Sequence, residues 1–120
     1  MQKLIWVEHK GKKILHSDHA RFGKDAKSVI KSIETAVQLV KDSGEKNILL
    51  LEDLRNIYVV PDIFAAFKIG GKEMEPYTKK TAAIGLKGSR KIFITIMARI
   101  TTLLPKHFDT YEEAIDWLIK

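Results

Sequence analysis

The sequence predicts an α/β domain in which helices cover a mixed, largely parallel sheet of four to five strands. Three observations support this fold class: the unbroken apolar run Ile48–Leu51, an amphipathic pattern over Asp25–Asp42, and a glycine-containing turn at Lys10-Gly11-Lys12. An apolar run without alternation is typical of a strand that helices bury on both faces. We therefore expect a single domain over residues 1–120, with an N-terminal β-hairpin and four helices.

The first third of the chain predicts the hairpin and the first helix. Strands are expected at Leu4–His9 and Lys13–Asp18, because glycine in the intervening turn permits positive φ. Over Asp25–Asp42, apolar residues recur every three or four positions, and Gly44 follows where a helix C-cap is expected. The next strand, Lys46–Glu52, completes a strand–helix–strand unit, which implies parallel pairing and a right-handed crossover.

The rest of the chain predicts two more strands and three more helices. A helix should begin at Pro61-Asp62, because proline suits the first turn and aspartate suits the helix dipole, and it should extend to about Glu75. A buried strand is expected at Thr81–Leu86, and a third helix at Arg90–Leu104. A short edge strand, Lys106–Asp109, leads to the capping box Thr110-x-x-Glu113 and a final helix.

The net charge of +6 is unevenly distributed along the chain. The segment Pro76–Phe108 contains no Asp or Glu, and the rest of the chain holds 14 basic and 15 acidic residues. The basic residues of that segment are Lys79, Lys80, Lys87, Arg90, Lys91, Arg99 and Lys106. Such asymmetry indicates a surface for an anionic partner over Lys79–Lys106, either an acidic protein, a phosphate or a lipid headgroup. The alternative is a solvated basic face that aids solubility.

Composition also restricts the class of protein. The chain has no cysteine, which excludes disulfides and thiolate chemistry and fits a cytoplasmic location. The N-terminus lacks the apolar core of a signal peptide, and no apolar run approaches the length of a membrane span. His16 and His19 should point to opposite faces of their strand, so we expect no metal site and assign both to a solvated strand end.

One loop has the composition of an anion-binding turn. Gly85-x-x-Gly88-Ser89 lies between a predicted strand and a helix, with Lys87, Arg90 and Lys91 beside it. It lacks the Gly-Lys-Ser/Thr ending of a nucleotide-binding P-loop, so a plain strand-to-helix turn is the alternative. We expect no nucleic-acid partner, because no DNA-reading motif appears and the basic residues lack interleaved aromatic side chains.

The predicted helix Arg90–Leu104 has an unusually wide apolar face. Core packing explains it most simply, but the face could also border a pocket for a hydrophobic ligand. Such a pocket would be lined by Phe64, Phe67, Phe93 and Met97, with Lys or Arg at its mouth. The same apolar face could instead contact a membrane surface peripherally or pair with a second copy of the chain in a homodimer.

The segments ILLLEDLRN (residues 48–56), Lys80–Gly88 and Phe108–Leu118 resemble the STAS-like family of small bacterial proteins, which have the fold of the anti-sigma-factor antagonists. The resemblance extends over nearly the whole chain and implies a mixed sheet whose strand-end loops contact partners. It also implies a phosphoacceptor serine after the central strand. That position falls on Pro61-Asp62 here, so the kinase-switched mechanism is not carried over. Asp62 could supply a permanent negative charge there, or could simply favour the helix start.

We expect no catalysis and no cofactor. Glu52 and Asp53 are adjacent, but no spacing places a His or Ser beside them. The prediction is a non-enzymatic STAS-like regulatory or interaction module that binds an acidic protein. The alternative is a carrier or sensor of a lipid-like ligand with an anionic headgroup. The candidate site residues are Asp53, Asp62, Phe64, Phe67, Lys87, Gly88, Ser89, Arg90, Lys91, Phe93 and Met97.

Overall fold

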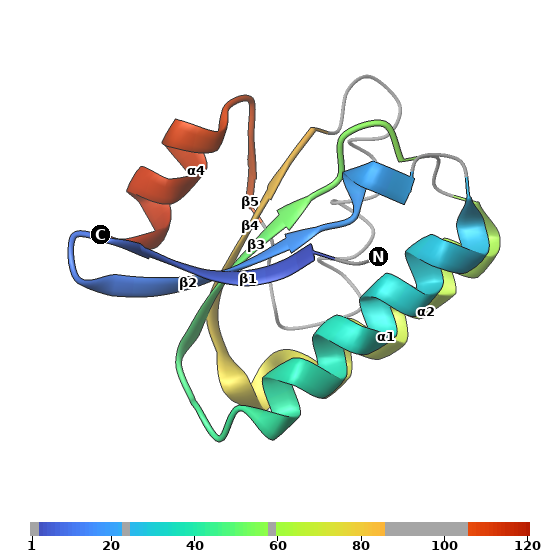
Figure 1. Cartoon of the computed structure of the whole chain (residues 1–120), viewed down its shortest axis with the longest axis horizontal. Helices are drawn as coiled ribbons and strands as arrows, with labels where there is room; N and C mark the ends of the chain where they lie inside the picture. Colours follow the sequence, from blue (N-terminus) through green and yellow to red (C-terminus); the bar gives the residue numbers. More distant parts are fainter. Residues whose placement is uncertain (1–2, 23–24, 58–59, 86–105) are drawn as a thin grey trace.

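The computed structural model describes residues 3–22, 25–57, 60–85 and 106–120. These residues form a five-stranded sheet with helices on both faces (Figure 1). The strands are β1 (Lys3–His9), β2 (Lys12–Asp18), β3 (Ile48–Asp53), β4 (Thr78–Ile84) and β5 (Lys106–Phe108). The α-helices are α1 (Ala26–Asp42), α2 (Pro61–Met74) and α4 (Tyr111–Leu118), and short 3₁₀ turns lie at Ala20–Phe22 and Glu75–Tyr77.

The sheet is mixed and largely parallel, as the sequence predicts. Its strand order is β1-β2-β3-β4-β5, in which β1 and β2 are antiparallel and every later pair is parallel. Lys10 and Gly11 both have positive φ, at 50° and 80°. A two-residue turn with this backbone matches the twist of a hairpin, so the predicted N-terminal hairpin is confirmed.

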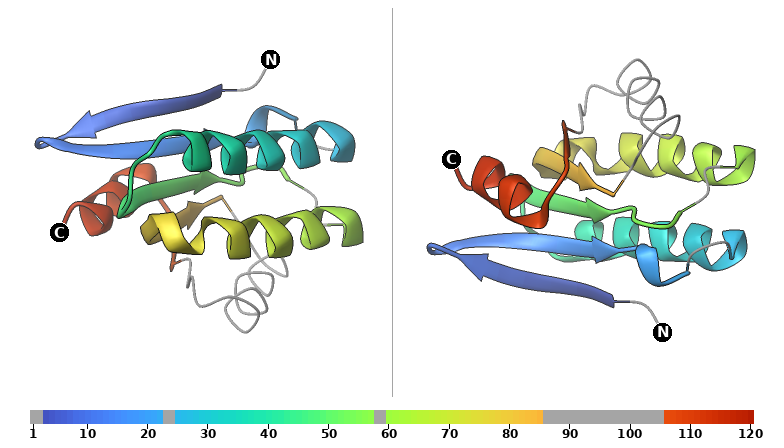
Figure 2. Two further views of the ribbon diagram at one scale, coloured as in Figure 1. Left: turned by 90° about the horizontal axis from the view of Figure 1, so that it is seen from below. Right: turned by 90° about the horizontal axis from the view of Figure 1, so that it is seen from above.

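The helices divide between the two faces of the sheet. Helices α1 and α2 lie side by side on one face, and α4 covers the other (Figure 2). The connection from β2 to β3 passes through α1, and the connection from β3 to β4 passes through α2. Both advance across the sheet in the same direction. Right-handed connections that advance in one direction place their helices on the same face. Helix α4 follows the last strand and returns over the face that the crossovers leave open.

Strand β3 lies at the centre of the core, and all six of its residues are buried. On the α4 side, Leu49 and Leu51 pack against Ile115 and Leu118. On the other side, Leu50 packs in a cluster with Val37 and Val40 of α1 and Met74 of α2. A strand that is covered on both faces has no polar face, which explains the unbroken apolar run.

The element boundaries lie within two residues of the predicted ones except at the start of β4, which comes three residues before the predicted Thr81. Gly44 follows α1 with φ of 71°, and Thr110 Oγ1 accepts a hydrogen bond from Glu113 N at 3.2 Å, so both predicted caps are confirmed. The third predicted helix, Arg90–Leu104, lies outside the described residues. None of the helices in the described ranges is long and apolar enough to cross a membrane.

Candidate functional site

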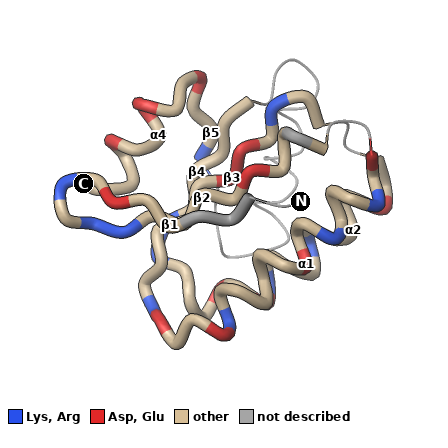
Figure 3. Tube along the Cα trace, in the orientation of Figure 1, with Lys and Arg blue, Asp and Glu red and all other residues tan. Residues whose placement is uncertain are grey.

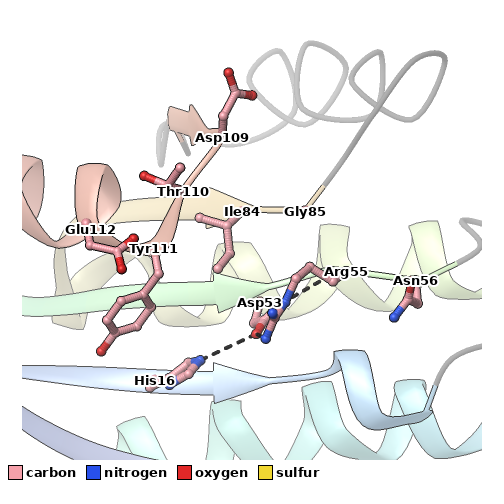
Figure 4. Close-up of a pocket in the computed structure, with 10 residues that line it drawn as sticks. All are labelled: His16, Asp53, Arg55, Asn56, Ile84, Gly85, Asp109, Thr110, Tyr111 and Glu112. Carbon is pink, nitrogen blue, oxygen red and sulfur yellow. Dashed lines mark hydrogen bonds and ion pairs between the residues drawn. The ribbon is translucent and has the colours of Figure 1, made fainter.

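An open pocket of about 590 Å³ lies at the carboxyl ends of the strands, between the end of β3 and the start of α4 (Figure 4). This edge of a parallel sheet is where α/β proteins commonly bind ligands. Most of the lining side chains are polar. The lining residues are His16, Asp53, Arg55, Asn56, Ile84, Gly85, Asp109, Thr110, Tyr111 and Glu112.

The base of the pocket is an ion pair between Asp53 and Arg55. Asp53 is fully buried, whereas the Arg55 side chain is 62% exposed. Arg55 donates from Nε to Asp53 Oδ1 at 2.9 Å and from Nη2 to Oδ2 at 2.7 Å. Burial alone would raise the pKa of Asp53, but the His16 ring and the hydrogen bonds from Arg55 outweigh it and hold that pKa well below its usual range. Asp53 is therefore ionised, and it orients the guanidinium.

The backbone packs closely around this ion pair. Gly85 follows β4 with φ of 95°, in the region that favours glycine. A Cβ atom at this position would overlap Arg55 Cγ and would lie 2.5 Å from Arg55 N. Arg55 N also donates to Asp53 Oδ1 at 3.3 Å. A glycine after β4 thus lets the Arg55 backbone approach β4 and the side chain reach back to Asp53.

A histidine from β2 and a tyrosine from α4 form one wall of the pocket. His16 Nε2 is buried, lies 3.8 Å from Asp53 Oδ2 and has no hydrogen-bond partner among the residues that the structure describes. The rings of His16 and Tyr111 are 5.8 Å apart, and the Tyr111 hydroxyl lies 3.5 Å from His9 Nε2. This wall is therefore aromatic, and one of its polar ring atoms lacks a hydrogen-bond partner within the described part of the chain.

The start of α4 supplies negative charge to the pocket. Asp109 and Glu112 are exposed and form no ion pair with any residue in the described ranges. Among the described lining residues, Arg55 is the one Lys or Arg. Figure 4 shows Arg55 and Glu112 on opposite sides of the pocket. The pocket therefore presents oriented donors on one side and a carboxylate on the other.

A second polar cluster lies on the opposite face of β3, beneath α1. Glu52 Oε2 lies 2.6 Å from Nε2 of His19, whose side chain is fully buried. Ser17 Oγ is 2.9 Å from the same nitrogen, and Ser32 Oγ is 2.8 Å from Nδ1. The ring packs edge-on against Phe67 at 5.7 Å between centroids. Glu52 and His19 are therefore paired with each other in the interior of the protein.

This cluster corrects two expectations. The assignment of His19 to a solvated strand end is wrong, because the chain turns inward after β2 and seals the ring beneath α1. The expectation that no His or Ser accompanies Glu52 and Asp53 is also wrong. Parallel pairing places Ser17 beside Glu52, which His19 also contacts, and His16 Nε2 lies 3.8 Å from Asp53 Oδ2. Within the described residues, no three His, Cys, Asp or Glu side chains are grouped to hold a metal ion.

The structure separates the candidate residues that it describes. Asp53 lies in the pocket, whereas Asp62 is exposed in the first turn of α2 and does not line it. Phe67 is buried and Phe64 is partly buried, and both pack in the core cluster that includes Ile63. The other candidates lie outside the described residues: Lys87, Gly88, Ser89, Arg90, Lys91, Phe93 and Met97.

Most of the pocket was not predicted from the sequence. The sequence pattern does not mark Arg55, Asn56, Tyr111 or Glu112 as site residues, and it marks His16 only as a candidate metal ligand. One signal was available, because β2 and β3 both end in polar residues and were predicted to be close in the sheet. Carboxyl ends of parallel strands meet at one edge, so their polar ends could have been paired.

Comparisons with known proteins establish the fold. No protein-family model matches the chain, and no curated protein matches it. Among solved structures, the chain is similar to the 2.25 Å crystal structure of an uncharacterized protein of the DUF3478 family, with a SpoIIAA-like fold, from Shewanella loihica PV-4. The TM-score is 0.68 at 15% identity, over 97% of this chain and 92% of that chain.

The chain therefore has the SpoIIAA-like fold, which is that of the anti-sigma-factor antagonists. The resemblance read from the sequence is confirmed at the level of the fold. At 15% identity the likeness shows the fold alone, so function has to be argued from the site.

Proposed function

We propose that the protein is a non-enzymatic interaction module, and that it binds a segment of a protein partner in the pocket beside Asp53 and Arg55. The observation that carries this proposal is the exposed guanidinium of Arg55, held in one orientation by a buried carboxylate. Arginine side chains that are fixed in advance lose little entropy on binding and are frequent centres of protein interfaces.

Arg55 favours a partner that presents hydrogen-bond acceptors. Two of its nitrogens donate to Asp53. The remaining guanidinium donors have no partner among the described residues and could bind a carboxylate or a backbone carbonyl. A carboxylate on the partner would pair with Arg55, although Arg55 is not among the basic residues of Lys79–Lys106 from which the sequence predicts an acidic partner. Glu112, on the other side, would accept hydrogen bonds from backbone or side-chain N–H groups. A peptide segment carries both kinds of group, whereas a simple anion would be repelled by Glu112.

The carboxylates of the site are poorly suited to catalysis. Asp53, whose pKa is held well below its usual range by His16 and Arg55, is a weak general base. Glu52 is bonded to a fully buried histidine on the other face of the strand. Both acidic side chains at the end of β3 are thus engaged by the protein itself, which supports a binding role.

The experiment is isolation of the tagged protein, with its bound partner, from the cells that normally produce it. We expect one protein partner to co-purify with the wild type and to be lost with Glu112→Lys, because lysine cannot accept hydrogen bonds from N–H groups of the partner. Glu112 is exposed, so this change leaves the core undisturbed. Arg55→Gln should also lose it. Lys31→Glu, on the exposed face of α1, is the matched control and should retain the partner.

The same experiment distinguishes the alternatives. A partner retained by both pocket variants would contradict the proposal. A lipid-like mass seen by native mass spectrometry, with no protein partner, would instead favour the carrier of an anionic-headed ligand. Turnover of a substrate that disappears with Asp53→Asn would show that the protein is an enzyme.

A further inference from the structure

A second hollow, of about 300 Å³, lies at the opposite edge of the sheet, where β3 and β4 begin. Basic residues gather at this end of the molecule, near the β1–β2 turn, while acidic residues mark the far ends of β2 and β3 (Figure 3). We call this feature the lysine hollow, after five of its lining residues: Lys12, Lys13, Lys46, Lys79 and Lys120.

The positive charge of the lysine hollow is largely uncompensated. Its lining contains one acidic residue, Glu45, which lies 2.8 Å from Lys13 Nζ. Within the described residues, the other four lysines form no ion pair with a carboxylate side chain. Like charges that converge on a concave surface repel each other and concentrate a positive potential there, which a bound anion would relieve.

Tertiary structure, rather than a run of basic sequence, creates this cluster. Lys12 begins β2, Lys46 precedes β3, and Lys120 follows α4. Lys79 is the extra residue of a β-bulge, since Ile48 pairs with Thr78 and Leu49 with Lys80. A bulge changes the direction of a side chain relative to a regular strand. Lys79 therefore lines the hollow, while Lys80 Nζ donates to Trp117 O on the α4 side at 3.1 Å.

We infer that the lysine hollow binds a small molecule that carries phosphate groups. Lysine ammonium groups are compact point charges that bind phosphate well, and several of them around one hollow suit a ligand with more than one negative charge. The volume is at the small end of ligand sites. A nucleic acid strand would need exposed rings for stacking, but Lys13 Nζ lies over Trp6 at 4.7 Å from its centroid.

This site is independent of the proposed partner pocket. The two lie at opposite ends of the parallel strands and share no lining residue. The phosphate groups could belong to a soluble molecule or to the headgroup of an anionic lipid. Both sources present the same chemistry to the lysines, and the experiment separates them.

The test uses inorganic pyrophosphate, followed by amide chemical shifts, and vesicles of phosphatidylcholine with or without phosphatidic acid. One of these probes, pyrophosphate or the phosphatidic acid vesicles, should bind the wild type. We expect the Lys46→Gln, Lys79→Gln double variant to bind that probe roughly 30-fold more weakly. The double variant Lys31→Gln, Lys68→Gln removes the same charge from exposed positions on α1 and α2, and it should bind like wild type.

Each outcome decides the question. Lysine-dependent binding of pyrophosphate supports the inference with a soluble ligand, and lysine-dependent binding only to phosphatidic acid vesicles supports it with a lipid headgroup. Absence of binding in both arms at millimolar probe overturns the inference. An equal loss of affinity in the α1 and α2 control also overturns it, because the attraction would then come from net charge alone.

Discussion

Glu52 Oε2 lies 2.6 Å from Nε2 of His19, in a position where the histidine has no exposure to solvent. Ser17 Oγ lies 2.9 Å from the same nitrogen and Ser32 Oγ lies 2.8 Å from Nδ1, so both ring nitrogens of His19 have hydrogen-bond partners. The next residue, Asp53, points to the other face of the sheet, towards His16. The consecutive carboxylates Glu52 and Asp53 thus lie on opposite faces of the sheet.

We predict that Glu52→Ala lowers the free energy of unfolding by about 2 kcal/mol, because it removes the carboxylate that is hydrogen-bonded to the buried Nε2 of His19. Glu52→Gln keeps an acceptor oxygen and should lose less. Urea unfolding monitored by circular dichroism measures both. If Glu52→Ala unfolds at the same urea concentration as wild type, the buried cluster contributes nothing to stability.

The stability of the protein should fall in acid because of Asp53. Its pKa in the folded state is below the unfolded value of about 3.9, so the folded protein binds fewer protons near that pH. The contribution of Asp53 to stability is therefore fully present well above pH 4 and is lost as the pH falls through the folded-state pKa.

Urea unfolding between pH 3 and pH 6 tests this dependence. Asp53→Asn should show a shallower loss of stability in acid than wild type. Asp109→Asn is the matched control, since this aspartate is exposed and forms no ion pair in the described part of the chain, and it should follow wild type. Parallel curves for wild type and Asp53→Asn would contradict the prediction.

Gly85→Ala should destabilise the protein by about 3 kcal/mol. The positive φ of 95° costs about 1–2 kcal/mol for an L-residue, and overlap with Arg55 adds a similar amount. Gly44→Ala is the comparison, because Gly44 also has positive φ, at 71°, but a Cβ there meets nothing within 4 Å. Its cost should be about 1 kcal/mol. Equal costs in thermal unfolding would mean that the contact with Arg55 relaxes freely.

Thr110→Ala should cost about 1 kcal/mol, because it removes the N-cap of α4 that accepts from Glu113 N at 3.2 Å. Since α4 begins at Tyr111, a frayed first turn should also weaken binding at the pocket. Thr110→Ser retains the hydroxyl and should behave like wild type in both measurements. A Thr110→Ala variant with unchanged unfolding and unchanged partner binding would exclude a role for this cap.

Local patterns were sufficient to predict the fold. Ile48–Leu51 is apolar without alternation because both faces of β3 are covered, and that requirement is visible in four consecutive residues. The turn at Gly11 and the cap at Thr110 are also local, since each depends on the backbone preference or hydrogen bonding of residues within one turn. Such signals do not require knowledge of which strands pair.

The pocket could not be predicted in the same way. His16, Arg55 and Tyr111 are far apart in the chain, and nothing in their neighbouring residues distinguishes them from ordinary surface positions. Their meeting depends on the register in which His16 pairs with Leu51 and on the return of the chain from β5 into α4. The lysine hollow likewise depends on a β-bulge at Lys79, which no local pattern in the sequence predicts.

The sequence by itself determined the α/β class, the N-terminal hairpin, the central strand and the limits of the helices that the structure describes, because hydrophobic periodicity and capping act over a few residues. Only the tertiary structure decided that Asp53 would orient Arg55, that Glu52 would be sealed against His19, and that lysines from four segments would converge. Those relationships arise from strand register and from the face that each helix covers, which are properties of the packed chain as a whole.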